Sequence, residues 1–152
     1  MRVVTLFTWL VTAFAGLYLL AIWLIEYDMS APGGAVSKLP RTVVGGHVVL
    51  AVSGLGVWVA FLIVRRDMLA WIALAALGAV ALLGFTMLGR WIMVRRAIAA
   101  ALRGRPKDAF AWARVPLPAE SRFPIPVVVA HGLLAVSTLT LVVLTCVGMG
   151  GG

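Results

Sequence analysis

The residues of this chain best suited to chemistry are two histidines, His47 and His131, and each begins nearly the same apolar stretch. The nine residues that start at His47 and the nine that start at His131 agree at six positions, and the sequence has no other histidine. Both lie near the start of an apolar segment, where the partial positive charge of a helix N-terminus and partial desolvation favour the neutral imidazole. A neutral imidazole is the form that binds a metal ion or haem iron.

The number of available ligands decides which of these centres the pair can serve. A zinc ion needs four ligands, or three and a water, and the apolar segments hold no carboxylate or second thiol that completes such a set. The single cysteine, Cys146, has no partner within the chain. Haem iron needs only two axial ligands from the protein. The pair therefore predicts one bis-histidine b-type haem, with His47 and His131 as axial ligands and its iron as the only metal that they hold.

Other interpretations of the pair stay open. Histidines near the ends of membrane helices often hydrogen-bond a neighbouring helix or a lipid head group. A protonatable pair or a quinone contact is a further alternative, which makes a quinone the second cofactor considered. The matching stretches have two explanations as well. They reflect either duplication of a two-helix hairpin or chance, because Leu-Ala-Val-Ser is an easy run for an apolar helix.

Composition places these histidines in a membrane protein. The chain of 152 residues is 63% apolar and only 12% charged, with a mean hydropathy of +1.10, which is outside the range of soluble domains. Four apolar stretches each reach the roughly 20 residues that cross a bilayer. They cover about 3–25, 43–64, 68–89 and 126–148. We expect an all-α integral membrane protein, a single domain over residues 1–152 with four transmembrane helices in an up-down bundle.

The third helix is expected to extend beyond the membrane. Its helical pattern continues past Trp91 to about residue 103, where Gly104 supplies a stop signal that Pro106 reinforces. If Pro40 and Pro126 mark the starts of the second and fourth helices, His47 and His131 lie at about 10 Å and about 8 Å along their axes. The two rings are therefore predicted to lie at similar depth, near the same face of the membrane.

Small and basic residues surround this predicted site. Glycine and alanine near the histidines would leave room for a macrocycle, although such residues are common at any close helix contact. They are Gly45, Gly46, Gly54, Gly56, Ala130 and Gly132. Basic residues on the same side could pair with the haem propionates. The candidates for that role are Arg41, Arg90 and Arg122.

The distribution of positive charge predicts the orientation. Ten of the thirteen lysines and arginines fall in the connections 26–42 and 90–123, and only Arg2, Arg65 and Arg66 fall on the side of the termini. The positive-inside rule places those two connections in the cytoplasm and both termini outside. The net charge of +8 fits a bilayer with anionic head groups as partner. No groove-reading or base-stacking motif accompanies the charge, so we expect no nucleic-acid partner.

One segment carries a resemblance. The run Phe-Pro-Ile-Pro-Val-Val-Val-Ala-His-Gly-Leu-Leu-Ala-Val from Phe123 to Val136 resembles the last helix of small, uncharacterised four-helix inner-membrane proteins of high-GC bacteria. The architecture is similar in outline to four-helix b-type cytochromes, including haem-anchoring subunits of respiratory complexes and superoxide-oxidising cytochromes. The resemblance implies a multi-pass protein of the bacterial inner membrane. Members with two haems need four ligands, whereas this chain has two histidines.

The sequence thus favours a membrane bundle that binds haem b for electron transfer, and it indicates no catalytic residues. A first alternative is a non-catalytic accessory or anchoring subunit, whose basic connections dock a larger membrane complex; the partner can equally be a second copy of this chain in a homo-oligomer. A second alternative is a small-solute channel or exporter. That function needs a polar path, and the spans offer mainly hydroxyl groups for it. An acidic residue deep in a span, which active transport usually requires, is missing from the sequence.

Overall fold

The computed structural model describes residues 1–26, 37–103 and 117–148, and its long elements are all helices. They are α1 (Arg2–Glu26), α2 (Arg41–Val64), α3 (Asp67–Arg103) and α4 (Ile125–Cys146), with a short 3-10 helix, η2 (Ala119–Arg122), before α4. Within these ranges there is no strand. The prediction of an all-α four-helix bundle is therefore confirmed. Much of the two long connections, 27–36 and 104–116, lies outside the described residues.

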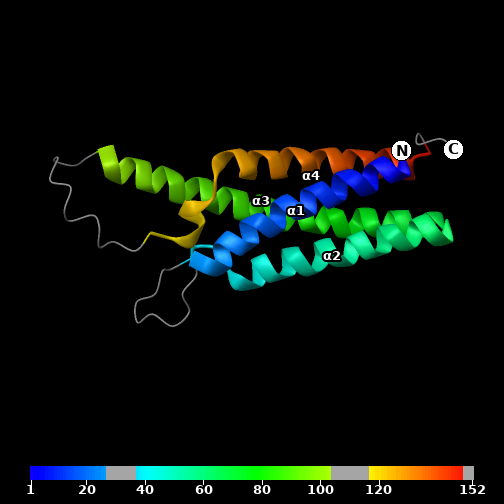
Figure 1. Cartoon of the computed structure of the whole chain (residues 1–152), viewed down its shortest axis with the longest axis horizontal. Coiled ribbons are helices and arrows are strands. Elements are labelled where there is room, and N and C mark those ends of the chain that lie inside the picture. Colours follow the sequence, from blue (N-terminus) through cyan, green and yellow to red (C-terminus); the bar gives the residue numbers. More distant parts are fainter. Residues whose placement is uncertain (27–36, 104–116, 149–152) are drawn as a thin grey trace.

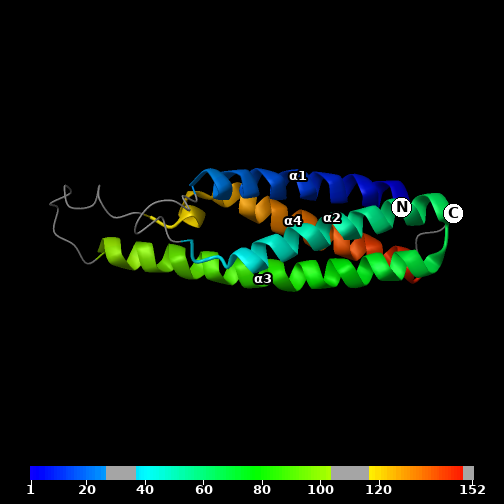
Figure 2. The ribbon, with the colours of Figure 1, turned by 90° about the horizontal axis from the view of Figure 1, so that it is seen from below.

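The helices run up and down and pack as two pairs (Figures 1 and 2). Helix α2 packs mainly on α3, and α1 packs mainly on α4. Smaller contacts between α3 and α4 and between α1 and α2 join the pairs. Within the described residues, the backbones of α2 and α4, and those of α1 and α3, do not approach closely. The start of α1, the α2–α3 turn and the end of α4 lie at one end of the bundle, which we call the terminal end. The other end, where α1 finishes and α2 and α4 begin, is called the basic end.

All four long helices have the length and composition to cross a membrane. Large apolar side chains on different helices face outward: Phe7 and Phe14 on α1, Leu82 on α3 and Leu133 on α4 are each more than 60% exposed. Such faces suit lipid rather than water. Helix α3, with 37 residues, is about 56 Å long. It exceeds the ~30 Å hydrocarbon layer, so the predicted extension of the third helix is confirmed.

The turn between α2 and α3 depends on one residue in the left-handed conformation. Arg65 has φ 59° and ψ 31°, and its N–H donates to the Phe61 carbonyl at 2.9 Å. This αL cap ends α2 and lets α3 start at Asp67, two residues later. A side chain with a Cβ is strained in this conformation, whereas glycine is not.

We expect the substitution Arg65→Gly to raise the free energy of unfolding by about 0.5–1 kcal/mol, because glycine removes the αL strain. Thermal unfolding in detergent, followed by circular dichroism, measures the change. Arg66→Gly is the matched control: it removes the same charge at a neighbour that has no positive φ, so it should bring no gain. An equal gain in both variants would show that charge, and not backbone strain, is responsible.

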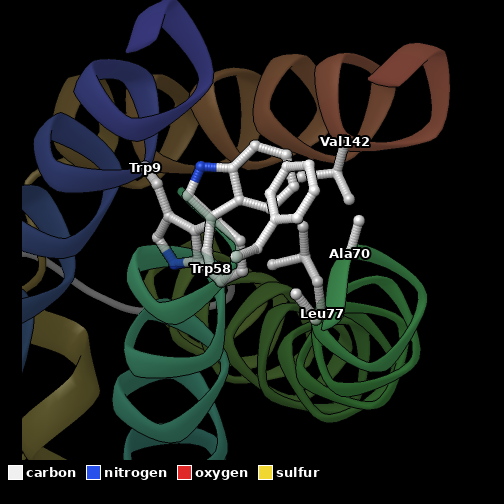
Figure 3. Packing of buried hydrophobic residues seen from close by; sticks show 7 residues of the cluster. Trp9, Trp58, Ala70, Leu77 and Val142 are labelled. Carbon is white, nitrogen blue, oxygen red and sulfur yellow. The ribbon is translucent and has the colours of Figure 1, made fainter. Parts of the chain in front are cut away.

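Two tryptophans dominate the apolar core in the terminal half of the bundle (Figure 3). Trp9 of α1 and Trp58 of α2 lie with their ring centroids 6.2 Å apart, at 3% and 0% exposure. Phe61, Ala70, Ala73, Leu77 and Val142 complete the cluster. A buried hydrogen bond of 3.2 Å between the hydroxyls of Thr12 and Thr138 joins α1 to α4 beside it. All four helices therefore meet in this half of the molecule.

A buried carboxylate organises the basic end. Glu120 of η2 is fully buried, and it accepts hydrogen bonds from the Lys38 N–H (2.7 Å) and the Ser37 hydroxyl (3.0 Å). Ser37 Oγ in turn accepts the indole N–H of Trp23 at 2.8 Å. These four residues, called the Glu120 clasp, tie the end of α1 and the segment before α2 to η2. They fix where α2 and α4 begin.

Removal of this carboxylate should destabilise the fold. Glu120→Ala leaves the Lys38 N–H without its acceptor, and we expect a loss of about 3 kcal/mol in the free energy of unfolding. Glu120→Gln keeps one acceptor oxygen and should lose less. Glu26→Ala is the control, because the Glu26 carboxylate is 40% exposed in a long 3.9 Å pair with Arg122 and such pairs contribute little. Denaturant titration of the detergent-solubilised protein measures all three, and equal losses for Glu120 and Glu26 would contradict the role of the clasp.

Candidate functional site

The bundle brings the two histidines together. His47 projects from α2 and His131 from α4, and their ring centroids are 6.4 Å apart with an angle of 57° between the ring planes. Both side chains are partly buried. The backbones of the two helices that carry them do not approach closely in the described residues, so the side chains bridge the distance across the bundle.

Each histidine ring is hydrogen-bonded to the helix against which its own helix packs: His47 to α3 and His131 to α1. His47 Nδ1 donates to the backbone carbonyl of Val80 on α3 at 3.0 Å, and His131 Nδ1 donates to that of Thr12 on α1, also at 3.0 Å. A carbonyl oxygen only accepts hydrogen bonds, so Nδ1 carries the proton in both rings. In a neutral imidazole the other nitrogen, Nε2, then keeps its lone pair and can bind a metal.

Two glycines permit this close approach. Gly16 lies one helical turn after Thr12, and a Cβ at this position would come within 3.0 Å of His131 Cε1. Gly84 lies one turn after Val80, where a Cβ would be 3.3 Å from His47 Cε1. Both distances are shorter than ordinary van der Waals contact. Each histidine ring therefore occupies space that a side chain on the opposing helix would fill.

The two halves of the chain use equivalent positions for this arrangement. His47 follows the capping residue Pro40 by seven residues, as His131 follows Pro124. A buried tryptophan also follows each of the two glycines by seven residues: they are Trp23 after Gly16 and Trp91 after Gly84, at 7% and 8% exposure. The α1–α2 and α3–α4 hairpins thus each contribute a histidine, a glycine and a tryptophan at corresponding positions. Each histidine bonds the other hairpin and not its own.

The small residues expected to make room at the site differ in their surroundings. A Cβ added at Gly45, Gly56 or Gly132 would have no other atom within 4 Å. Ala130 is exposed. Gly54 packs tightly on Trp9 and Ala76, and Gly46 packs more loosely on Leu83. Room for a macrocycle beside these residues therefore stays a prediction, because spacing from a histidine along its own helix does not reveal what the facing helix supplies.

Sequence reasoning missed the two glycines that do contact the rings. One signal was present, since Thr12 and Gly16 have the same spacing as Val80 and Gly84, and a tryptophan follows both glycines at the same interval. Recognition of that match needs an alignment of α1 with α3, two helices whose sequences otherwise differ. The Glu120 clasp was also missed, because no periodic pattern marks a carboxylate in a connection as buried.

The three arginines proposed for the propionates all lie toward the basic end. Arg41 is the first residue of α2, and Arg90 Nη1 donates to the Lys38 carbonyl at 3.1 Å. Arg122 lies 3.9 Å from Glu26, between its Nε and a carboxylate oxygen. Arg41 precedes His47 and Arg90 follows Gly84 by six residues each, about 9 Å along the helix. These two arginines are therefore at corresponding heights above the ring pair.

Ligand number and comparisons complete the description of the site. Among residues 1–26, 37–103 and 117–148, no group of three or more histidine, cysteine, aspartate or glutamate side chains is placed to hold a metal ion. Comparisons with family models, with curated proteins and with solved structures found no match to this chain.

The fit between glycine and imidazole gives a testable prediction. We expect Gly16→Ala and Gly84→Ala to lower the free energy of unfolding by about 1–3 kcal/mol, because each new methyl group forces a histidine ring away from its carbonyl partner. Gly16→Ala should cost more, since its Cβ would be nearer to the ring. Gly56→Ala is the control, with open space at the same atom, and should be neutral or gain up to about 1 kcal/mol. Thermal unfolding in detergent measures all three variants. If Gly16→Ala and Gly84→Ala were no less stable than Gly56→Ala, this packing would be contradicted.

Proposed function

We propose that this chain binds one b-type haem between α2 and α4, with His47 and His131 as axial ligands, and that it transfers electrons at the membrane. The observation that carries the proposal is the separation of the two rings. A metal–imidazole bond is about 2 Å long and the bonded nitrogen lies about 1.1 Å from the ring centre, so two rings on opposite sides of one metal have centroids about 6 Å apart. The observed separation is 6.4 Å.

The hydrogen bonds of the rings support the same function. Because both Nδ1 atoms donate to backbone carbonyls, Nε2 is the nitrogen left to bind iron in each ring. Metal-ligating histidines usually donate their second ring N–H to a carbonyl or carboxylate, which fixes the ring and makes it a better electron donor. Val80 and Thr12 supply such carbonyls through their backbone, so the orientation is built into the helices.

Helix packing and ligand number also fit a haem better than a metal ion. The backbones of the described parts of α2 and α4 do not approach closely, so a planar group between their histidines would lie between side chains and not between tightly packed backbones. A metal ion would need further protein ligands, and the described residues place none beside the pair. Haem iron needs only these two.

Haem iron, when bound, supplies a one-electron change between its ferric and ferrous states. The protein residues hold it: His47 and His131 as ligands, with Arg41 and Arg90 as partners for the propionates at the basic end. We place the protein in the bacterial inner membrane, with the basic end in the cytoplasm and both termini outside, on the distribution of positive charge. The four-helix architecture is similar in outline to that of b-type cytochromes, which supports this proposal, and a quinone is a suitable membrane-soluble electron partner.

The proposal predicts an optical signature that depends on both histidines. Protein purified from haem-replete cells should show a Soret band and, after reduction, the sharp alpha band of low-spin haem. His47→Ala and His131→Ala should each abolish the low-spin spectrum, because either change leaves iron with one axial ligand. Ser53→Ala is the matched control, since Ser53 lies on the same helix as His47 within the repeated stretch but is exposed.

A colourless wild-type protein would contradict haem binding. A low-spin spectrum that survives in both histidine variants would contradict the ligand assignment. The accessory-subunit alternative predicts a different result: the chain copurifies with other proteins, and that association is unchanged by either histidine substitution.

A further inference from the structure

A second polar site lies at the basic end, beyond the histidine pair. A pocket of about 360 Å³ opens between the extension of α3 and the segment that contains η2. Its lining residues are Arg95, Ile98, Ala99, Leu117, Ser121 and Arg122. Among the described residues, this lining includes two arginines and no acidic side chain. The pocket therefore combines positive charge with an apolar wall.

The polar groups of the pocket are arranged for an anion. Arg95 is held in place by Trp91, with its guanidinium carbon 5.4 Å from the centroid of a Trp91 ring. Ser121 Oγ is buried and has no hydrogen-bond partner in the described structure, which is costly unless a ligand supplies one. Among the described residues, Arg122 has a long, exposed pair with Glu26, a weak interaction that an anion can replace. Two guanidiniums and a hydroxyl can donate hydrogen bonds to the oxygens of a phosphate group.

The height of the pocket indicates where that phosphate comes from. Arg95 lies about 42 Å along α3 from Asp67, which corresponds to the head-group region beyond a ~30 Å hydrocarbon layer. On the other wall, Ser121 and Arg122 lie just before α4 begins at Ile125. Ile98, Ala99 and Leu117 offer apolar contact beside the charges. A phosphate at this level with apolar atoms attached is what a phospholipid presents.

We propose that the pocket binds the phosphate of an anionic phospholipid, held by Arg95, Arg122 and the Ser121 hydroxyl. Basic pockets beside transmembrane helices bind anionic head groups in this way. The site is separate from the histidines and does not depend on haem. A bound lipid would join the extension of α3 to η2, and thereby to the Glu120 clasp.

Native mass spectrometry of the full chain in detergent tests the site, with phosphatidylglycerol as the probe and phosphatidylcholine as the comparison. We expect one phosphatidylglycerol to bind more tightly than phosphatidylcholine, and the double variant R95Q/R122Q to weaken it by about tenfold or more. Ser121→Ala, a milder change, should weaken it less. The matched control is R96Q/R103Q, which removes the same charge from two exposed arginines of α3 outside the pocket and should have little effect.

Three results would overturn the proposal. Equal weakening by both double variants would show general electrostatic attraction, and equal binding of the two lipids would show no recognition of anionic lipid. Displacement of phosphatidylglycerol by millimolar inorganic phosphate would identify a soluble phosphate as the ligand. Should R95Q/R122Q fail to fold, Ser121→Ala and Arg95→Lys, which keeps the charge but loses the fork of the guanidinium, decide the question on their own.

Discussion

The arrangement of this bundle depends on the hydrogen bond that each histidine donates to a backbone carbonyl of the neighbouring helix. In a bilayer the helices satisfy their own backbone groups, and apolar faces alone allow neighbouring helices to slide and rotate. The bonds from His47 to Val80 and from His131 to Thr12 restrict both movements. They form only because Gly16 and Gly84 leave space for the rings. The same bonds that align α2 on α3 and α4 on α1 also direct the two imidazoles toward each other.

The two hairpins are equivalent around the histidines but differ toward the ends of the bundle. The matched positions of capping proline, histidine, glycine and tryptophan are what duplication of a two-helix hairpin would produce. At the terminal end, the Trp9–Trp58 cluster closes the core, and a tight turn at Arg65 joins the hairpins. At the basic end, the Glu120 clasp and the arginine pocket have no counterpart among the described residues. The shared middle carries the proposed redox site, while the divergent basic end carries the proposed lipid pocket.

Some of this organisation could be predicted from the sequence and some could not. Apolar length alone predicted four spanning helices, and the helical pattern that continues past Trp91 predicted that the third would extend. The repeated stretch singled out His47 and His131, because a match in sequence and in distance from a helix start implies a match in depth. The facing partners were not predictable in this way. Gly16 and Gly84 matter because of how α1 and α3 are rotated, and Glu120 is buried because a connection folds back, and neither property follows from periodicity along one helix.

In the proposed function, one haem iron lies between His47 and His131. Electron paramagnetic resonance of the oxidised, purified protein tests this, because the spectrum of ferric haem reports the spin state and the nature of both axial ligands. We expect a low-spin ferric signal with two imidazole ligands, at one haem per chain. A high-spin signal from wild-type protein, or a preparation from haem-replete cells that holds no iron, would contradict it.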